Sequence, residues 1–318
     1  MSDFSTQIKE KARAIGFDLC GIAQAETPSD YGHFLTWLDR GFAASMSYLA
    51  QRKEERRDPS SLLPGVKSMI ICALNYRTTQ QKSTELAPGE GWIAQYALGE
   101  DYHRIMKEKL ERLGDFLLEC AGGNGRFKAY VDTGPILEKN YAARAGLGWM
   151  GKNTLLLHQE LGSMFFLGEI LTDIFLEPDQ PTTDHCGSCR RCIDACPTGA
   201  LVEPYVLDSN RCISYWTIEH RGEIPEEMEN LTGHHLFGCD ICQEVCPWNQ
   251  DAPLTKIDQF QARPESFRPQ LKEIANLNEE AYQIRFRRSA VKRAKRSGLM
   301  RNAKIALANK FRASFRLI

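Results

Sequence analysis

The stretch CGSCRRCIDACP at residues 186–197 places four cysteines in the spacing C-x2-C-x2-C-x3-C, with a proline directly after the last. A second run, CDICQEVCP at residues 239–247, has the spacing C-x2-C-x3-C-P and lacks only the first cysteine of that pattern, where Leu236 stands. Cys212 lies between the two runs and can supply the missing thiolate. Eight of the eleven cysteines therefore fall between residues 186 and 246, which indicates a metal-binding segment.

This spacing is typical of double-cluster ferredoxins, in which the fourth cysteine of a run binds the other [4Fe–4S] cluster. The first cluster is predicted to take Cys186, Cys189, Cys192 and Cys246, and the second Cys196, Cys212, Cys239 and Cys242. A pair of zinc sites is the alternative, but zinc sites seldom use overlapping triplets followed by proline. Cys20, Cys72 and Cys120 stand alone in apolar surroundings and are expected to be buried core thiols.

The composition is that of a globular chain large enough for two or three subdomains. It has 318 residues, of which 42% are hydrophobic and 25% charged. No apolar run approaches the roughly 18 residues needed to cross a bilayer, and residues 1–18 form a charged amphipathic pattern rather than a signal peptide. We therefore expect a cytoplasmic protein with no membrane partner.

Hydrophobic periodicity predicts a mixed α+β fold. Helical patterns cover residues 3–15, 31–51, 102–121 and 136–146, and strand patterns cover 66–76, 126–133 and 163–176, the last as one or two strands. A proline-bearing linker at residues 177–184 precedes the cysteines, and the chain beyond residues 252–269 has a helical pattern to its end. Three domains are predicted: an α+β domain at 1–177, a two-cluster domain at 178–252 and a helical region at 253–318.

The charge of the chain is distributed unevenly. The formal net charge is −1, yet the segment from Ala281 to Ile318 holds twelve Lys or Arg and no Asp or Glu, which leaves −13 on residues 1–280. Basic and apolar residues alternate there at helical spacing, so one face can pack while the other neutralises phosphates. The alternative is an ordinary solvated charged face.

Four segments resemble the epoxyqueuosine reductase family: YVDTGP (130–135), GLGWMGKNT (146–154), SYWTIEHRG (214–222) and FGCDICQEVCPWN (237–249). The resemblance spans essentially residues 1–310. It implies that two [4Fe–4S] clusters pass electrons to a cobalamin, which reduces epoxyqueuosine to queuosine at the wobble position of a tRNA anticodon loop, the last step of queuosine biosynthesis. It also implies a nitroreductase-like corrinoid domain, a ferredoxin-like domain and a HEAT-like helical region, in a monomer reduced by a flavodoxin or ferredoxin.

The same resemblance implies roles for individual residues. Asp132 matches the proton donor, although an Asp before Thr-Gly-Pro also suits an Asx turn, and Tyr102, His103 and His220 are the next candidates. The resemblance implies a base-off cobalamin without a protein histidine below the cobalt. The D-x-H-x-x-G signature of His-on corrinoid proteins is absent, because Met106 stands where glycine is needed. Its contacts are predicted at Arg56, Asp132, Lys152, Asn153, Thr154, Leu156, Ser214 and Tyr215. A solvated helix face explains Arg56 equally well, and the neighbouring Arg57 is an alternative match.

Contacts to tRNA are predicted on the basic segment and near the clusters. The residues are His220, Arg221, Arg288, Lys292, Arg293, Lys295, Arg296, Arg301 and Lys304, with Tyr215 beside the first two as lining for an unstacked base. Two other functions fit parts of the sequence. A corrinoid reductive dehalogenase would need no basic tail, and a non-catalytic two-cluster electron carrier would not need the roughly 180 residues before the cysteines.

Overall fold

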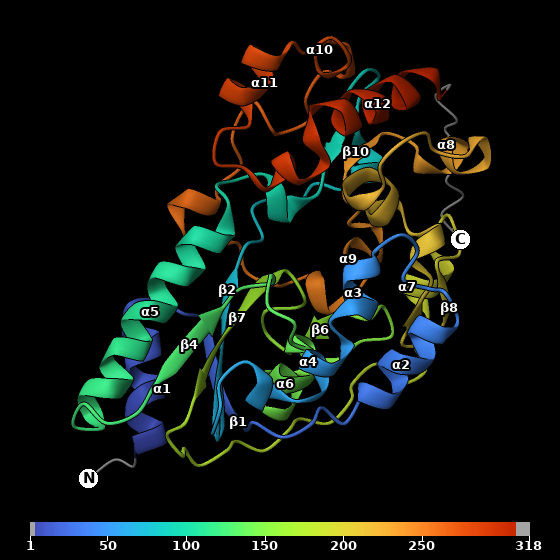
Figure 1. Cartoon of the computed structure of the whole chain (residues 1–318). Helices are drawn as coiled ribbons and strands as arrows, with labels where there is room; N and C mark the ends of the chain where they lie inside the picture. Colours follow the sequence, from blue (N-terminus) through green and yellow to red (C-terminus); the bar gives the residue numbers. More distant parts are fainter. Residues whose placement is uncertain (1–3, 310–318) are drawn as a thin grey trace. The chain divides into compact units, whose positions relative to one another are not determined.

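The protein, a computed structural model describing residues 4–309, divides into two compact units (Figure 1). The first unit comprises Met1–Asn75 and Tyr102–Cys189, and the second comprises Tyr76–Asp101 and Arg190–Ile318. This division differs from the three domains predicted from the sequence. The segment 76–101 belongs with the later cysteines and the helical region, and the predicted boundary at 177 lies inside the first unit.

None of the helices between residues 4 and 309 is long and apolar enough to cross a membrane.

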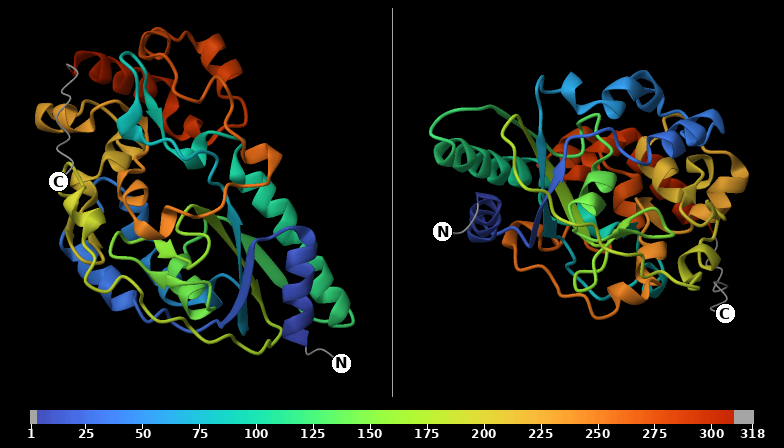
Figure 2. Two further views of the ribbon diagram at one scale, coloured as in Figure 1. Left: turned by 180° about the vertical axis from the view of Figure 1, so that it is seen from behind. Right: turned by 90° about the horizontal axis from the view of Figure 1, so that it is seen from below.

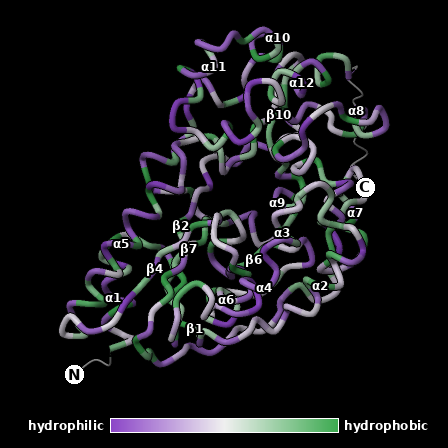
Figure 3. The backbone as a smooth tube through the Cα atoms, in the orientation of Figure 1, coloured by the Kyte–Doolittle hydropathy of each residue, from purple (hydrophilic) through white to green (hydrophobic). Residues whose placement is uncertain are grey.

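An antiparallel sheet of four strands forms the centre of the first unit. Its order is β1 (Leu19–Gln24), β2 (Ser68–Asn75), β7 (Phe165–Thr172) and β4 (Phe127–Tyr130). Every residue of β2 and β7 is buried, as expected for central strands that carry apolar side chains on both faces (Figure 3).

Helices cover both faces of this sheet. Helices α1 (Phe4–Ile15) and α5 (Tyr102–Cys120) lie side by side (Figure 2), and Gly168 of β7 faces α5, since a Cβ there would meet Leu110 at 2.8 Å. Neighbouring residues of a strand point to opposite faces of the sheet. The residues next to Gly168 therefore point to the opposite face from α5, where they share a core with α6 (Glu138–Arg144). A polar side chain at such a position is therefore enclosed between the sheet and α6.

The sequence predicted most of these elements, and two of them differ from the prediction. The helical pattern at 31–51 is broken into α2 (Tyr31–Asp39) and α3 (Ser47–Gln51), followed by α4 (Lys53–Arg57), because Gly41 and Ala44 take positive φ angles of 71° and 51°. The strand pattern at 126–133 ends at Tyr130, and the pattern at 163–176 is a single strand. Cys120 was expected to be buried but is exposed at the end of α5, whereas Cys72 is buried as predicted.

The second unit is mainly helical. A short parallel pair, β3 (Trp92–Ile93) and β10 (His235–Phe237), packs with α12 (Lys295–Ala308) around a core that includes Phe286 and Leu299. Its other elements are α7 (Arg191–Asp194), β8 (Leu201–Glu203), β9 (Val206–Leu207), the π-helix η5 (Tyr215–Glu219), α8 (Glu226–Thr232), α9 (Ile241–Glu244), α10 (Leu271–Ala275), α11 (Glu279–Arg285) and the 3-10 helix η8 (Ala290–Ala294). The end of the predicted helical tail, residues 310–318, lies outside the described residues.

Asn302 joins α12 to the segments that carry the later cysteines. It is 2% exposed, and its Nδ2 donates to the carbonyls of Thr217 (3.0 Å) and Leu236 (2.8 Å). We expect Asn302→Leu to lower the free energy of unfolding by about 2–4 kcal/mol, because two buried carbonyls lose their donor. Urea unfolding of this variant and of Lys304→Ala, an exposed site on the same helix, measures the difference. A loss no larger than that of the control would contradict the structural role.

Candidate functional site

Six of the eight clustered cysteines belong to the second unit, and four of them form one group. Cys242 interacts electrostatically with Cys212, Cys196 and Cys192, and Cys239 interacts with Cys242 and Cys212. The sequence prediction assigns Cys192 to the first cluster. Contacts between α7 and α9 bring the first and last parts of this segment together, although Cys196 and Cys239 are far apart in sequence. The group Cys196, Cys212, Cys239 and Cys242 is the set predicted for the second cluster.

Without a metal, this cysteine group stays protonated. Burial raises the pKa of the thiols of Cys212, Cys239 and Cys242, and neighbouring cysteines raise it further, because closely spaced thiolates repel one another. A cationic iron–sulfur cluster would favour the thiolates, since it binds each of them directly. No group of three or more His, Cys, Asp or Glu side chains among residues 4–309 converges on one metal ion. A cubane needs no such convergence, because each of its irons takes one thiolate.

Backbone N–H groups point at several of these sulfurs. The amides of Ser214 and Tyr215 donate to the Cys212 thiol, and the Ala200 amide lies 3.3 Å from the Cys196 Sγ. Such bonds stabilise a reduced cluster, because they place partial positive charge beside the sulfur. The predicted cobalamin contacts Ser214 and Tyr215 thus donate backbone hydrogen bonds to Cys212, a thiol predicted to bind the second cluster.

The first unit holds Cys186 and Cys189 on a tight loop. The Cys189 amide donates to the Cys186 carbonyl (3.1 Å), and the Lys152 ammonium donates to the carbonyls of Gly187 (2.5 Å) and Cys189 (3.0 Å). The Nζ of Lys152 thus fastens this loop, and the predicted contact of Lys152 to cobalamin stays a prediction. Cys192 and Cys246 belong to the second unit, so the set of four predicted for the first cluster stays a prediction.

Asp132 occupies a strained turn beyond the end of β4. Its φ is 56°, and the Thr133 amide donates to the Val131 carbonyl at 2.5 Å, which defines a γ-turn centred on Asp132. Strain of this kind costs about 1–3 kcal/mol and persists at functional sites. The carboxylate is 59% exposed and lies 3.5 Å from Nε2 of His103, on the first turn of α5. The Asp132 carboxylate is thus accessible to a substrate and lies beside His103, a side chain that can exchange a proton with it.

Two further carboxyls interact electrostatically with Asp132, and the sequence analysis missed both. Glu169 is 1% exposed within β7, and Glu138, which is half-buried, begins α6. Burial raises the pKa of Glu138 to about 7, with the charge of Asp132 adding to the effect, and the pKa of Glu169 lies well above its ordinary value for the same two kinds of cause. A signal was present, because Glu169 is an acidic residue inside an otherwise apolar strand pattern.

The segment from Lys152 to Leu156 forms the turn of a small hairpin. The hairpin pairs β5 (Trp149–Met150) with β6 (Leu156–Leu157), and Thr154 takes a positive φ of 65° in the turn between them. Asn153 is buried, and its Nδ2 has no hydrogen-bond partner. A buried amide donor without a partner costs free energy, so it indicates a ligand acceptor at this turn.

Arg56 is packed rather than solvated. Its side chain is buried, and Nη1 donates to the carbonyls of Arg52 (3.1 Å) and Leu49 (3.5 Å). The guanidinium also lies over the ring of Phe34, 5.9 Å from its centroid. The solvated-face alternative for Arg56 is therefore wrong, and Arg57 is the exposed member of the pair.

The residues predicted to line a base pocket belong to one small aromatic group. The Tyr215 hydroxyl lies 3.4 Å from Nδ1 of His220, and the Trp216 and His220 rings are 4.5 Å apart. Nε2 of His220 contacts the carbonyl of Glu223 at 2.7 Å, and the Arg221 guanidinium donates to the carbonyl of Arg293 at 2.7 Å. Tyr215 and His220 thus lie together and Arg221 fastens η5 to η8, while the lining of a base pocket stays a prediction.

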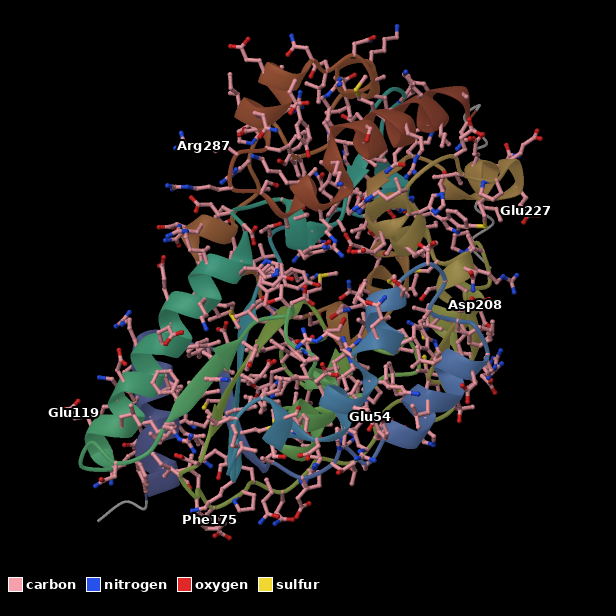
Figure 4. All side chains as sticks on the ribbon, viewed as in Figure 1. Glu54, Glu119, Phe175, Asp208, Glu227 and Arg287 are labelled. Atoms are coloured by element: carbon pink, nitrogen blue, oxygen red, sulfur yellow. The ribbon has the colours of Figure 1, made fainter. Side chains whose placement is uncertain are left out.

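The predicted tRNA-binding residues fall into two sets. Arg301 is structural, because its guanidinium donates to the carbonyls of Trp216, His220 and Gly222 at 2.6–3.3 Å. Ion pairs also neutralise two others, Arg293 with Glu219 at 2.7 Å and Arg296 with Glu279 at 2.9 Å. Exposed basic side chains remain at Arg288, Lys292, Lys295 and Lys304, and Arg287 also projects outward from the second unit (Figure 4).

The fold and the cysteine group define an iron–sulfur protein, and comparisons with known proteins specify it further. Residues 185–249 match the family model "4Fe-4S double cluster binding domain", and residues 56–133 match "Epoxyqueuosine reductase QueG, DUF1730". The epoxyqueuosine reductase of Synechocystis sp. is 44% identical over 289 residues, which are 90% of this chain and 98% of that protein.

Solved structures agree. A crystal structure of epoxyqueuosine reductase with an epoxyqueuosine-modified tRNA-Tyr stem loop has a TM-score of 0.88 and 34% identity, covering 96% of this chain and 80% of that one. The Bacillus subtilis enzyme, with its catalytic aspartate loop swung out of the active site, has a TM-score of 0.85 and 32% identity, covering 96% and 81%. This chain belongs to the epoxyqueuosine reductase family.

Proposed function

We propose that this chain reduces epoxyqueuosine to queuosine in the anticodon loop of tRNA. The observation that carries the proposal is membership of the epoxyqueuosine reductase family over nearly the whole chain. Two features of the molecule support it: a cysteine group suited to iron–sulfur clusters, and a strained, exposed aspartate at the end of β4. The tRNA substrate also supports a cytoplasmic location.

The stoichiometry of electrons and protons in this reaction is fixed by its chemistry. An epoxide becomes an alkene when its oxygen leaves as water, and this consumes two electrons and two protons. Iron–sulfur clusters deliver electrons singly, so two clusters in sequence suit the electron supply. We assign the first cluster to Cys186, Cys189, Cys192 and Cys246 and the second to Cys196, Cys212, Cys239 and Cys242, with a flavodoxin or ferredoxin as reductant of a monomer.

A cobalamin fits the residues around the β5–β6 turn. Asn153 offers a buried Nδ2 without a hydrogen-bond partner, which suits the amide side chains of a corrin ring. When bound, the cobalamin would supply a strongly reducing centre for cleavage of the C–O bond. We place its contacts at Asn153, Thr154 and Leu156 in a nitroreductase-like fold. Lys152 and Arg56 would act indirectly, by shaping loops of the first unit, and the predicted contacts at Ser214 and Tyr215 stay proposals.

Asp132 is the proton donor in this proposal. The departing epoxide oxygen gains negative charge as its C–O bond breaks, and a carboxylic acid within reach removes that charge by protonation. After donation, the Asp132 carboxylate lies 3.5 Å from Nε2 of His103, which stabilises it if the imidazole is protonated. The γ-turn fixes the position of the carboxyl group relative to β4.

The tRNA would bind the exposed basic side chains of the second unit. This unit would combine a ferredoxin-like part with a HEAT-like helical region. Exchange of Lys292, Lys295 and Lys304 for alanine should weaken tRNA binding and reduce the slope of log affinity against log salt by about 2, since each phosphate contact contributes about 0.7–0.9. Filter binding at several salt concentrations measures both. Lys11, Lys53 and Lys67, on the first unit, provide a matched triple exchange. Equal slopes for the two triple variants would contradict this assignment.

Complementation tests the proposed function in cells. A bacterium without its own epoxyqueuosine reductase accumulates epoxyqueuosine in tRNA, and expression of this chain should restore queuosine. Nucleoside analysis by mass spectrometry reports the conversion. Persistent epoxyqueuosine beside well-expressed, cluster-containing protein would overturn the proposal.

A further inference from the structure

A hollow of about 400 Å³ lies on the second unit, where residues of α11, η8 and the first turn of α12 line it. Its volume is within the range of ligand-binding pockets, about 300–1,000 Å³. Every side chain in its lining carries a charge, an amide or a hydroxyl. An apolar ligand would leave these groups without partners, so the hollow suits a polar or charged ligand.

Three cations and one carboxylate line this hollow, which leaves a net charge of +2. The carboxylate of Glu279 is already engaged, because Arg296 Nε donates to its Oε2 at 2.9 Å and Gln283 Nε2 donates to its Oε1 at 2.7 Å. The ammonium of Lys292 donates to Oε1 of Gln283 at 2.7 Å and keeps its charge, because the amide is neutral. The side chain of Lys295 is exposed and forms no hydrogen bond or ion pair with another residue of 4–309. The hollow therefore attracts an anion.

The hydroxyl of Tyr282 is the group in this hollow that most directly indicates a ligand. The side chain is only 4% exposed, and its ring packs against Phe286 with the centroids 5.6 Å apart, so the direction of the hydroxyl is fixed. This hydroxyl forms no hydrogen bond with any residue that the structure describes. Burial raises the pKa of Tyr282, so the hydroxyl keeps its proton and can donate it to a hydrogen bond. A fixed donor in the lining of a cationic hollow suits an anionic oxygen as its acceptor.

The first turn of α12 adds to this preference. The helix begins at Lys295 with no side-chain cap and with no acidic residue in its first turn. Its aligned peptide dipoles place partial positive charge at this end, which favours a negatively charged group. Ser297, on the same turn, is exposed, and its hydroxyl forms no hydrogen bond with another described residue. It can donate to the same ligand.

We propose that this hollow holds one backbone phosphate of the tRNA anticodon stem loop, with Lys292 and Lys295 supplying charge and Tyr282 supplying a fixed donor. This inference rests on the proposed function, which makes tRNA the substrate. A backbone phosphate carries one negative charge and two free oxygens. It can therefore pair with an ammonium and accept a hydrogen bond from a hydroxyl at the same time.

The open rim and the fixed hydroxyl favour a phosphate of a polymer over a free ion. The lysines and Ser297 on the rim are exposed, so a phosphate within an RNA strand can enter while the adjoining nucleotides stay in solvent. Exposed lysines attract any phosphate of the strand, whereas the buried Tyr282 donates only to the phosphate that reaches it. Contacts to phosphates fix the register of a protein on nucleic acid. The hollow would thus set the position of the stem loop on the second unit.

Tyr282→Phe removes the hydroxyl and keeps the ring. We expect it to bind an epoxyqueuosine-containing stem loop about tenfold more weakly, because a hydrogen bond to a charged group is lost. The slope of log affinity against log salt should equal that of the parent, because no charge is removed. The variant should unfold at the temperature of the parent or above it, since the hydroxyl has no protein partner to lose. Filter binding and thermal unfolding measure these quantities.

Tyr205→Phe is the matched control, because Tyr205 is an exposed tyrosine of the second unit between β8 and β9. It should bind the stem loop as the parent does. Equal stem-loop affinity of the parent, Tyr282→Phe and Tyr205→Phe would overturn the phosphate site. A clearly lower unfolding temperature of Tyr282→Phe would also overturn it, because the hydroxyl would then serve the fold.

Stem loops with single neutral phosphates locate the contact. Each carries a methylphosphonate in place of one phosphate and so lacks the charge at one known position. The parent should lose affinity at the position that the hollow holds. There Tyr282→Phe should cause less further loss than at other positions, since both changes remove parts of one contact. Additive losses of log affinity at every position would contradict the assignment.

Inorganic phosphate, titrated alone, separates a site for RNA from a site for a free ion. Weaker binding of inorganic phosphate by Tyr282→Phe, with stem-loop affinity unchanged, would overturn the assignment to tRNA. Failure of the proposed function would look different. A parent that binds the stem loop through one Tyr282-dependent phosphate but never converts epoxyqueuosine would overturn that function and would support the phosphate site.

Discussion

Asp132→Asn is expected to lower the single-turnover rate of epoxyqueuosine reduction by about 10²–10⁴-fold, the usual contribution of a general acid. The amide has nearly the same shape as the acid but no acidic proton. Asn also tolerates positive φ, so the γ-turn should persist and both clusters and tRNA binding should be retained. Rapid mixing with a strong reductant, followed by nucleoside analysis, measures the rate.

The control for this prediction is Asp115→Asn, an exposed aspartate on α5. It carries the same chemical change away from the site, and we expect its rate to equal that of the parent. A turn role for Asp132 would give the opposite pattern, with lower stability and near-normal chemistry. A rate for Asp132→Asn within a few-fold of the parent would move the role of acid to His103, the residue 3.5 Å away.

Cys242→Ser is expected to remove one cluster and abolish turnover with a protein electron donor. Cys242 is the member of the second-unit group that interacts with the most other cysteines, so its loss should leave that cluster without a complete ligand set. Iron should fall from about eight to about four atoms per chain after anaerobic reconstitution. Metal analysis and the EPR spectrum of the reduced protein measure the change.

Cys120→Ser provides a matched control, because Cys120 is exposed at the end of α5 and outside both cysteine runs. It should keep about eight irons. Cys186→Ser should also leave about four irons, but of the other cluster, with a different EPR signal. Zinc in the purified protein, or the same cluster lost in Cys186→Ser and Cys242→Ser, would contradict the crossed assignment.

The cysteine sites could be predicted because their ligands are encoded locally. Fixed spacing within each run determines which thiolates a tight loop can present, and only Cys212 had to be added from a distance. Asp132 was found by resemblance to a known family, not by its spacing. The sequence contained no sign of the γ-turn, because positive φ at a non-glycine residue results from the surrounding structure.

The two carboxyls that interact with Asp132 could not be predicted in the same way. Glu138 and Glu169 lie 31 positions apart and interact only because α6 packs on the face of the sheet to which Glu169 points. Helical spacing likewise indicated that Arg301 would face solvent. It could not reveal that the carbonyls of residues 216–222 turn toward α12 and engage that guanidinium.

The conversion of epoxyqueuosine by the purified chain tests the central claim most directly. The protein would be reconstituted anaerobically with iron, sulfide and cobalamin, then mixed with an epoxyqueuosine-containing anticodon stem loop and a strong reductant. We expect mass spectrometry of the nucleosides to show queuosine, lighter than epoxyqueuosine by one oxygen, and to show no conversion when cobalamin is omitted. Unchanged epoxyqueuosine in the presence of protein that holds both clusters and cobalamin would contradict the account.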